Sequence, residues 1–192
     1  MVEPYNFYMI NEQEFVASVN ELAHDPRRAW DALDDIEEEL AQQEGAAFTD
    51  VEIPVFEDLK SFEQFFWKKT SITFCDFRPE IRIVPSPRGI VHVGSSTCLD
   101  ELPECFSDES RAIWSHLDGE RGFPFFYRDE YQLLLNDLDL AQQREAQIDV
   151  TSMSNLDRSV HEELSADLNE IVPKAKEAIE AGYADAMVVW WG

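Results

Sequence analysis

Hydrophobic residues along the chain follow two spacings, one typical of helices and one typical of strands. The longest helical pattern has apolar residues three or four positions apart, at Leu156, Val160, Leu164, Leu168, Ile171, Ala175 and Ile179. This spacing places them on one face of a helix. Pro173 lies inside the pattern and has no backbone N–H, so we expect a kink or a break near residues 169–172.

Shorter helical patterns come before it, and several begin at residues that cap helices well. Asn11 precedes a pattern over residues 12–23, and Asp25 and Pro26 open another that stops at Gly45. Asn, Asp and Ser side chains accept hydrogen bonds from the first helical N–H groups, and proline favours the first helical position. Further helices are predicted near residues 61–67, 107–117 and 129–141.

Period-two alternation predicts the sheet. It occurs at residues 6–10, 71–77, 80–84 and 90–93, and an apolar run at 186–191 predicts a buried C-terminal strand. Short turns join the segments within 71–94, so we expect an antiparallel meander there, with the C-terminal strand in the same sheet. The predicted fold class is α+β, one domain over residues 1–192, with about five or six helices on a small, mostly antiparallel sheet.

The charge of the chain limits the partners that it can bind. Forty Asp and Glu residues face 15 Lys and Arg residues, for a formal net charge of −25. A field of this sign repels nucleic acid and anionic membranes and attracts basic surfaces. Three cysteines are too few for a disulfide framework, so we expect free thiols in a cytoplasmic protein.

The densest acidic stretch lies in the predicted helix over residues 26–44. Its carboxylates form a candidate partner-binding face at Asp31, Asp34, Asp35, Glu38 and Glu39. Like charges three or four residues apart destabilise a helix, and a partner carrying Lys or Arg would relieve this repulsion. The alternative is a solvated helix face that keeps the protein soluble.

A second acidic surface is expected on the long C-terminal helix. Its carboxylates are Asp157, Glu162, Glu163, Asp167, Glu170, Glu177 and Glu180. Arg158, Lys174 and Lys176 dilute the negative charge there. A solvated helix face therefore explains this second surface more simply than a binding site does.

An aromatic run at residues 123–127 is predicted to lie in a loop. Phe125 and Tyr127 within it are candidate partner contacts. Aromatic side chains ringed by charged residues are typical of the hot spots of protein interfaces. Burial of these rings in the core is the alternative.

No motif in the sequence fixes a catalytic chemistry or a metal site. The four histidines have no metal-ligand spacing, and the residues after His161 lack the second histidine of a zinc motif. Cys98 with His92 or His116 is a cysteine–histidine combination, but it has no supporting motif. We expect no cofactor and no metal, and we favour a binding protein over an enzyme.

These features predict an acidic protein that binds and occludes a basic surface of a protein partner. It would be an immunity protein for a basic toxin, or a DNA mimic whose carboxylates stand where phosphates would. The alternatives are a cytosolic enzyme or small-molecule-binding protein with its site near residues 94–105, and an acidic accessory subunit of a larger complex. Direct binding to nucleic acid or to a membrane is not expected.

Overall fold

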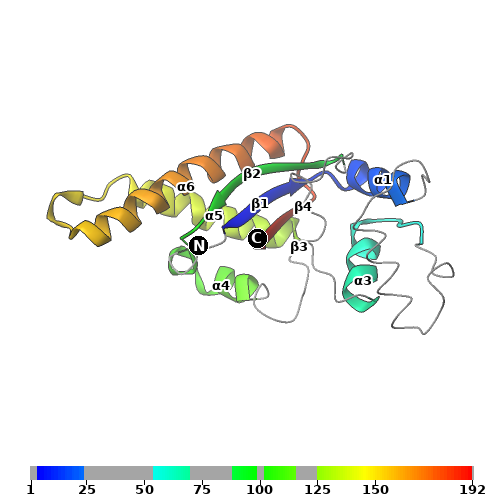
Figure 1. Ribbon diagram of the computed structural model, residues 1–192, viewed down its shortest axis with the longest axis horizontal. Helices are drawn as coiled ribbons and strands as arrows, with labels where there is room; N and C mark the ends of the chain where they lie inside the picture. The colour runs from blue at the N-terminus through cyan, green and yellow to red at the C-terminus, as the bar shows by residue number, and fades with distance from the viewer. Residues whose placement is uncertain (1–3, 24–53, 70–87, 99–101, 116–124, 192) are drawn as a thin grey trace.

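Four strands form the sheet on which the described part of the chain is built (Figure 1). The computed structural model describes residues 4–23, 54–69, 88–98, 102–115 and 125–191. The strands, in sheet order, are β2 (Ile90–Ser96), β1 (Tyr5–Ile10), β4 (Ala186–Trp191) and β3 (Phe125–Tyr127). All three pairings are antiparallel.

Five α-helices are described with this sheet, and they confirm the predicted α+β fold. They are α1 (Glu12–Ala23), α3 (Leu59–Lys69), α4 (Asp108–Trp114), α5 (Arg128–Glu145) and α6 (Asn155–Glu180). Two 3₁₀ turns, η3 (Pro103–Cys105) and η5 (Val150–Ser152), lie before α4 and α6. Within the described segments, no helix combines the length and the hydropathy that crossing a bilayer requires.

Side-chain caps fix where several helices begin. The Asn11 carboxamide oxygen accepts a hydrogen bond from the Glu14 N–H at 3.0 Å. The Ser107 and Ser154 hydroxyls accept from the N–H groups of Ser110 and Asp157 in the same way. These contacts satisfy N–H groups that have no partner within the helix. The predicted helix at 12–23 and the predicted strand at 186–191 are both confirmed.

The two faces of the sheet are both buried, each against different helices. Phe7, Met9 and Val189 belong to the core that α4, α5 and α6 complete. The opposite face carries buried Tyr8 and Phe125.

Rings from α1 and α3 cover part of this opposite face. The Phe125 ring lies 6.3 Å from that of Phe62 on α3, which lies 5.3 Å from that of Phe15 on α1. The sheet is therefore the middle layer between two groups of helices.

Gly94 lets α6 lie close to β2. A Cβ at this position would lie 2.7 Å from Cγ1 of Ile171, which is shorter than real Cβ contacts. Its φ of +150° also disfavours other residues. The register between β1 and β2 shifts beside it, between Phe7 and Tyr8. A bulge and a glycine together therefore position α6 against the sheet.

One prediction about local structure is wrong, and another is wrong in part. Residues 125–127, predicted to lie in a loop, form β3 and pair with β4. Helix α6 continues through Pro173, so a break, one of the two outcomes predicted there, does not occur. Pro173 is exposed, whereas Ile171, Val172 and Ala175 around it are buried. Packing on the inner side holds the helix, and the carbonyl that proline leaves without a donor lies on the side that water reaches.

Several predicted elements lie outside the described residues. They are the helix at 26–44 and the strands at 71–77 and 80–84. The return strand expected at 90–93 is present as β2 and extends to Ser96. It lies in the same sheet as β4, with β1 between them.

Candidate functional site

The residues predicted to bind a partner fall in very different places. Asp31, Asp34, Asp35, Glu38 and Glu39 lie outside the described residues. Phe125 is fully buried in β3, so a partner would reach it only if the core opened. Tyr127 is half-buried at the end of the same strand.

Tyr127 links the sheet to α3. Its hydroxyl donates a hydrogen bond of 2.6 Å to the carboxylate of Glu63. Burial raises the pKa of Tyr127 far above its usual value, and the contact with Glu63 adds to this effect. The phenol therefore stays protonated at ordinary pH and keeps its donor. This arrangement gives Tyr127 a structural role in the described part of the molecule.

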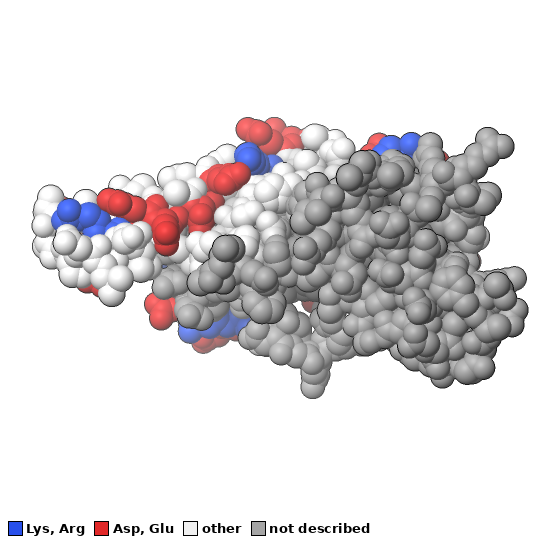
Figure 2. All heavy atoms as spheres, viewed as in Figure 1, with Lys and Arg blue, Asp and Glu red and all other residues white. Residues whose placement is uncertain are grey.

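Helix α6 carries the main acidic surface of the described residues. Its exposed carboxylates are Asp157, Glu162, Glu163, Glu170, Glu177 and Glu180. Glu163, Glu170 and Glu177 follow at intervals of seven residues, so they form a row with steps of about 10.5 Å. Figure 2 shows carboxylates along this helix, with Lys and Arg side chains between them.

One lysine of α6 neutralises a carboxylate of the same helix, and another pairs with α5. The Lys174 ammonium group lies 2.7 Å from the Glu170 carboxylate, and that of Lys176 lies 2.7 Å from Asp139 on α5. Glu162, Glu163, Glu177 and Glu180 form no ion pair with another described residue. These four exposed carboxylates therefore carry negative charge of α6 that no described cation neutralises.

A second polar cluster lies where β2 meets β1. Nε2 of His92 lies 3.1 Å from Oγ of Ser95. The Ser95 hydroxyl in turn donates to the Asn6 carboxamide oxygen at 2.7 Å. Because Ser95 gives its only hydrogen to Asn6, the His92 ring donates to Ser95 and does not accept its proton. His92 is thus not placed to activate Ser95 as a nucleophile.

The protonation of His92 follows from its surroundings. Burial lowers its pKa below the usual value, and nearby Lys174 acts in the same direction, while Glu170 opposes them. The ring lies on Tyr8, with 5.1 Å between the centroids. His92 is therefore neutral at pH 7, and its exposed side chain donates to Ser95 beside the sheet.

Asp167 ties the chain after β2 to α6. Burial raises its pKa above the usual value, although contacts with Ser96, Cys98 and the Thr97 N–H oppose that change. Cys98 is buried beside this carboxylate. Reactive thiolates need positive neighbours, so the arrangement around Cys98 does not favour nucleophilic chemistry. Among the described side chains, no group of three His, Cys, Asp or Glu residues is placed to hold a metal ion.

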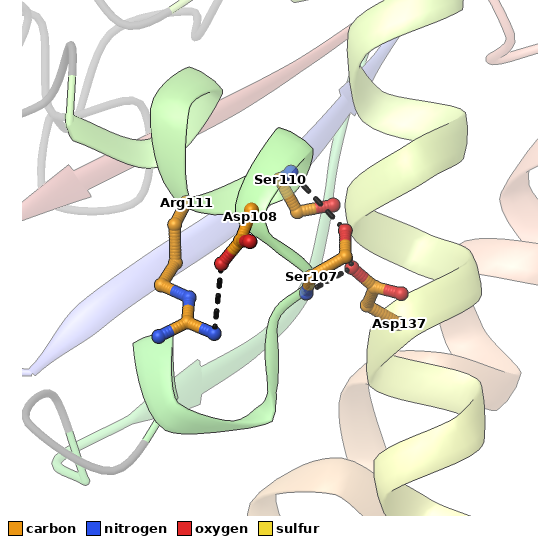
Figure 3. A network of polar contacts seen from close by, with 5 residues as sticks. All are labelled: Ser107, Asp108, Ser110, Arg111 and Asp137. Carbon is orange, nitrogen blue, oxygen red and sulfur yellow. Dashed lines mark hydrogen bonds and ion pairs between the residues drawn. The ribbon is translucent and has the colours of Figure 1, made fainter.

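A serine and an aspartate join α4 to α5 (Figure 3). The Ser107 N–H and hydroxyl both donate to Oδ2 of Asp137, at 2.9 and 2.7 Å. Burial alone would raise the pKa of Asp137. Contacts with the Ser110 side chain and with the N–H and hydroxyl of Ser107 have the larger combined effect and hold this pKa below its usual value. The network positions α4, whose Trp114 lies stacked near Phe7 in the core.

The apolar end of the α5–α6 hairpin was missed by the sequence prediction. Leu156 belongs to the apolar face predicted from the spacing at residues 156–179, but it is exposed. A signal was available: the apolar stripe predicted for residues 129–141 ends before the turn. The first turn of the antiparallel α6 therefore has no apolar partner on α5.

The chain was compared with models of protein families, with curated proteins and with solved structures, and none of them matched.

Proposed function

We propose that this protein binds a partner protein and that it recognises a cationic surface of that partner. The observation that carries the proposal is the set of exposed carboxylates on α6 that form no ion pair with another described residue, Glu163 and Glu177 among them. The whole chain carries a net charge of −25, so its long-range field has the same sign as this helix. Such a field accelerates the approach of a basic partner and turns acidic competitors away.

The shape of α6 suits recognition of a surface by a rigid element. Its 26 residues span about 39 Å, and its inner face is fixed by buried Leu168 and Ile171. A partner would meet carboxylates that are already held in place, so little ordering accompanies binding. Lys174 and Lys176 interrupt the acidic row, which favours a compact contact, as in an immunity protein, over continuous mimicry of a phosphate backbone.

Capture from a native lysate at low salt tests the proposal. The immobilised protein is expected to retain one basic protein that elutes between about 0.2 and 0.5 M salt, where charges are screened over a few ångströms. Mass spectrometry identifies it, and competition with duplex DNA separates a DNA-mimic target from a toxin. Retention of nothing, or only of abundant basic proteins such as ribosomal ones, would mean that the charge serves solubility.

Charge reversal locates the binding face. We expect Glu163→Lys with Glu177→Lys, and separately Asp34→Lys with Glu38→Lys, to lower the association rate constant more than they raise the dissociation rate constant. Glu104→Lys with Glu109→Lys is the matched control, since both carboxylates are exposed near α4 and the change in net charge is the same. If all three pairs lowered the association rate constant equally, neither acidic face could be assigned as the binding face.

A further inference from the structure

The closed end of the α5–α6 hairpin exposes large apolar side chains. We call residues 146–157, between the helices and into the first turn of α6, the hairpin tip. Ile148 is 40% exposed there and Leu156 is 74% exposed. Among the side chains that the structure describes, only two other large hydrophobic residues are exposed, Val55 and Leu140, and Leu140 lies on the same hairpin. Figure 1 shows the tip extending beyond the sheet.

The backbone of the hairpin tip is held by its own polar side chains. The Asp149 carboxylate accepts hydrogen bonds from the N–H and the hydroxyl of Thr151, at 3.0 and 2.7 Å. Ser154 caps α6, and Nη2 of Arg158 donates to the Val150 carbonyl at 3.0 Å. The polar groups are thus directed at the backbone while Ile148 and Leu156 face outward. An ordered turn presents its apolar side chains with little loss of conformational entropy on binding.

A contact between α5 and α6 holds the two helices together next to the hairpin tip. Nδ1 of His161 lies 2.5 Å from the carboxylate of Glu145, and both side chains are mostly buried. This contact joins the last turn of α5 to α6. The turn is therefore attached to the rest of the hairpin on both sides.

The charges around the hairpin tip are complementary to a cationic partner. Within residues 146–157 the charged side chains are Asp149 and Asp157, with no Lys or Arg. Glu162 and Glu163 follow on α6 and are exposed. Arg158 directs its guanidinium at the turn. Arg144, exposed in the last turn of α5, and Arg158 flank the tip, so two arginines face five carboxylates between residues 144 and 163: Glu145, Asp149, Asp157, Glu162 and Glu163. This acidic excess near two exposed apolar side chains suits apolar side chains flanked by Lys or Arg.

We propose that the hairpin tip receives a basic amphipathic segment of the partner protein, whose apolar side chains cover Ile148 and Leu156. The inference rests on the proposed function and names the part of the molecule that determines affinity. The carboxylates govern the association rate. The two apolar side chains govern the dissociation rate, because their contacts form only in the docked complex.

A designed peptide serves as the probe. An 18-residue amphipathic helix of Leu and Lys is titrated into the ¹⁵N-labelled protein, beside a peptide of equal charge in which Ser replaces Leu. The amphipathic peptide is expected to shift the amide resonances of residues 146–163 and to bind about tenfold more tightly than the Ser peptide. Leu156→Gln should lower its affinity about tenfold, whereas Val55→Gln, an equally drastic change at a 69% exposed site, should leave it unchanged.

The outcomes separate this inference from the proposed function. Equal binding of both peptides, with shifts over acidic regions away from the tip, would overturn the role of the tip and leave the acidic binding surface standing. Equal effects of Leu156→Gln and Val55→Gln would also overturn it. Failure of both peptides to bind at low salt would count against both proposals.

Discussion

The two ends of the α5–α6 hairpin have opposite chemistry. At the end that packs on the sheet, which we call the hairpin base, the facing side chains are apolar and buried: Leu134, Leu138, Leu168, Ile171 and Ala175. At the hairpin tip the polar side chains hold the backbone, and Ile148 and Leu156 are exposed. The same pair of helices therefore contributes to stability at one end and presents an apolar surface at the other.

This contrast shows that an apolar residue on a helix does not by itself indicate core. Leu168 and Leu156 belong to the same predicted stripe, yet the first is fully buried and the second is mostly exposed. The difference lies in what stands opposite each of them. Leu168 belongs to the core cluster with residues of α5 and the sheet, whereas Leu156 lies beyond the last apolar residue of α5.

The largest expected effect comes from truncating a side chain of the hairpin base. Leu168→Ala should lower the free energy of unfolding by about 2–5 kcal/mol, because a fully buried leucine leaves a cavity. Leu156→Ala is the matched control, with a change of about 0.5 kcal/mol or less. Urea unfolding measures both. Similar losses at the two positions would abolish the distinction between base and tip.

A smaller effect is expected at the contact between β2 and α6. Gly94→Ala should cost about 1–3 kcal/mol, because its Cβ would meet Cγ1 of Ile171 at 2.7 Å. Gly182→Ala is the control, since it also has a positive φ but its Cβ would be 3.9 Å from the nearest side-chain atom. Thermal unfolding measures both variants. Equal losses of stability would mean that backbone conformation alone, and not the contact with Ile171, explains the cost at Gly94.

The smallest effect is a change in pH dependence near the hairpin base. The folded-state pKa of Asp137 is lowered, so its stabilising contribution is present above the unfolded value and is lost as pH falls through the folded pKa. Asp137→Asn should therefore destabilise the protein at pH 7, and the difference from the wild-type should shrink below about pH 4. Urea unfolding across this range tests it, and a difference that does not vary with pH would contradict the assignment.

Local sequence signals predicted the elements that depend on neighbouring residues. Asn11 fixed the start of α1, and the apolar run at 186–191 gave β4 with its observed bounds. The three residues of β3 were missed because pairing with β4 and burial of Phe125 hold them, and both are long-range contacts. Of the kink or break expected near Pro173, the break does not occur for the same reason: packing of α6 on the sheet outweighs a local preference.

The candidate site was predictable only in part. The acidic character of α6 was readable from the sequence. Which lysines of α6 neutralise its own carboxylates depends on contacts such as that of Lys176 with Asp139 on α5, and these two residues lie far apart in the chain. The exposure of Ile148 and Leu156 depends on where two antiparallel helices stop facing each other. Such facts follow from three-dimensional packing and not from residue type.

The most direct test of the account is the association rate constant of the captured partner at two ionic strengths, measured by biolayer interferometry. If carboxylates steer the encounter, the rate constant should fall at least about tenfold between 0.02 and 0.3 M salt, while the dissociation rate constant changes little. An association rate constant that does not depend on salt would contradict the claim that the acidic surface is the means by which this protein finds its partner.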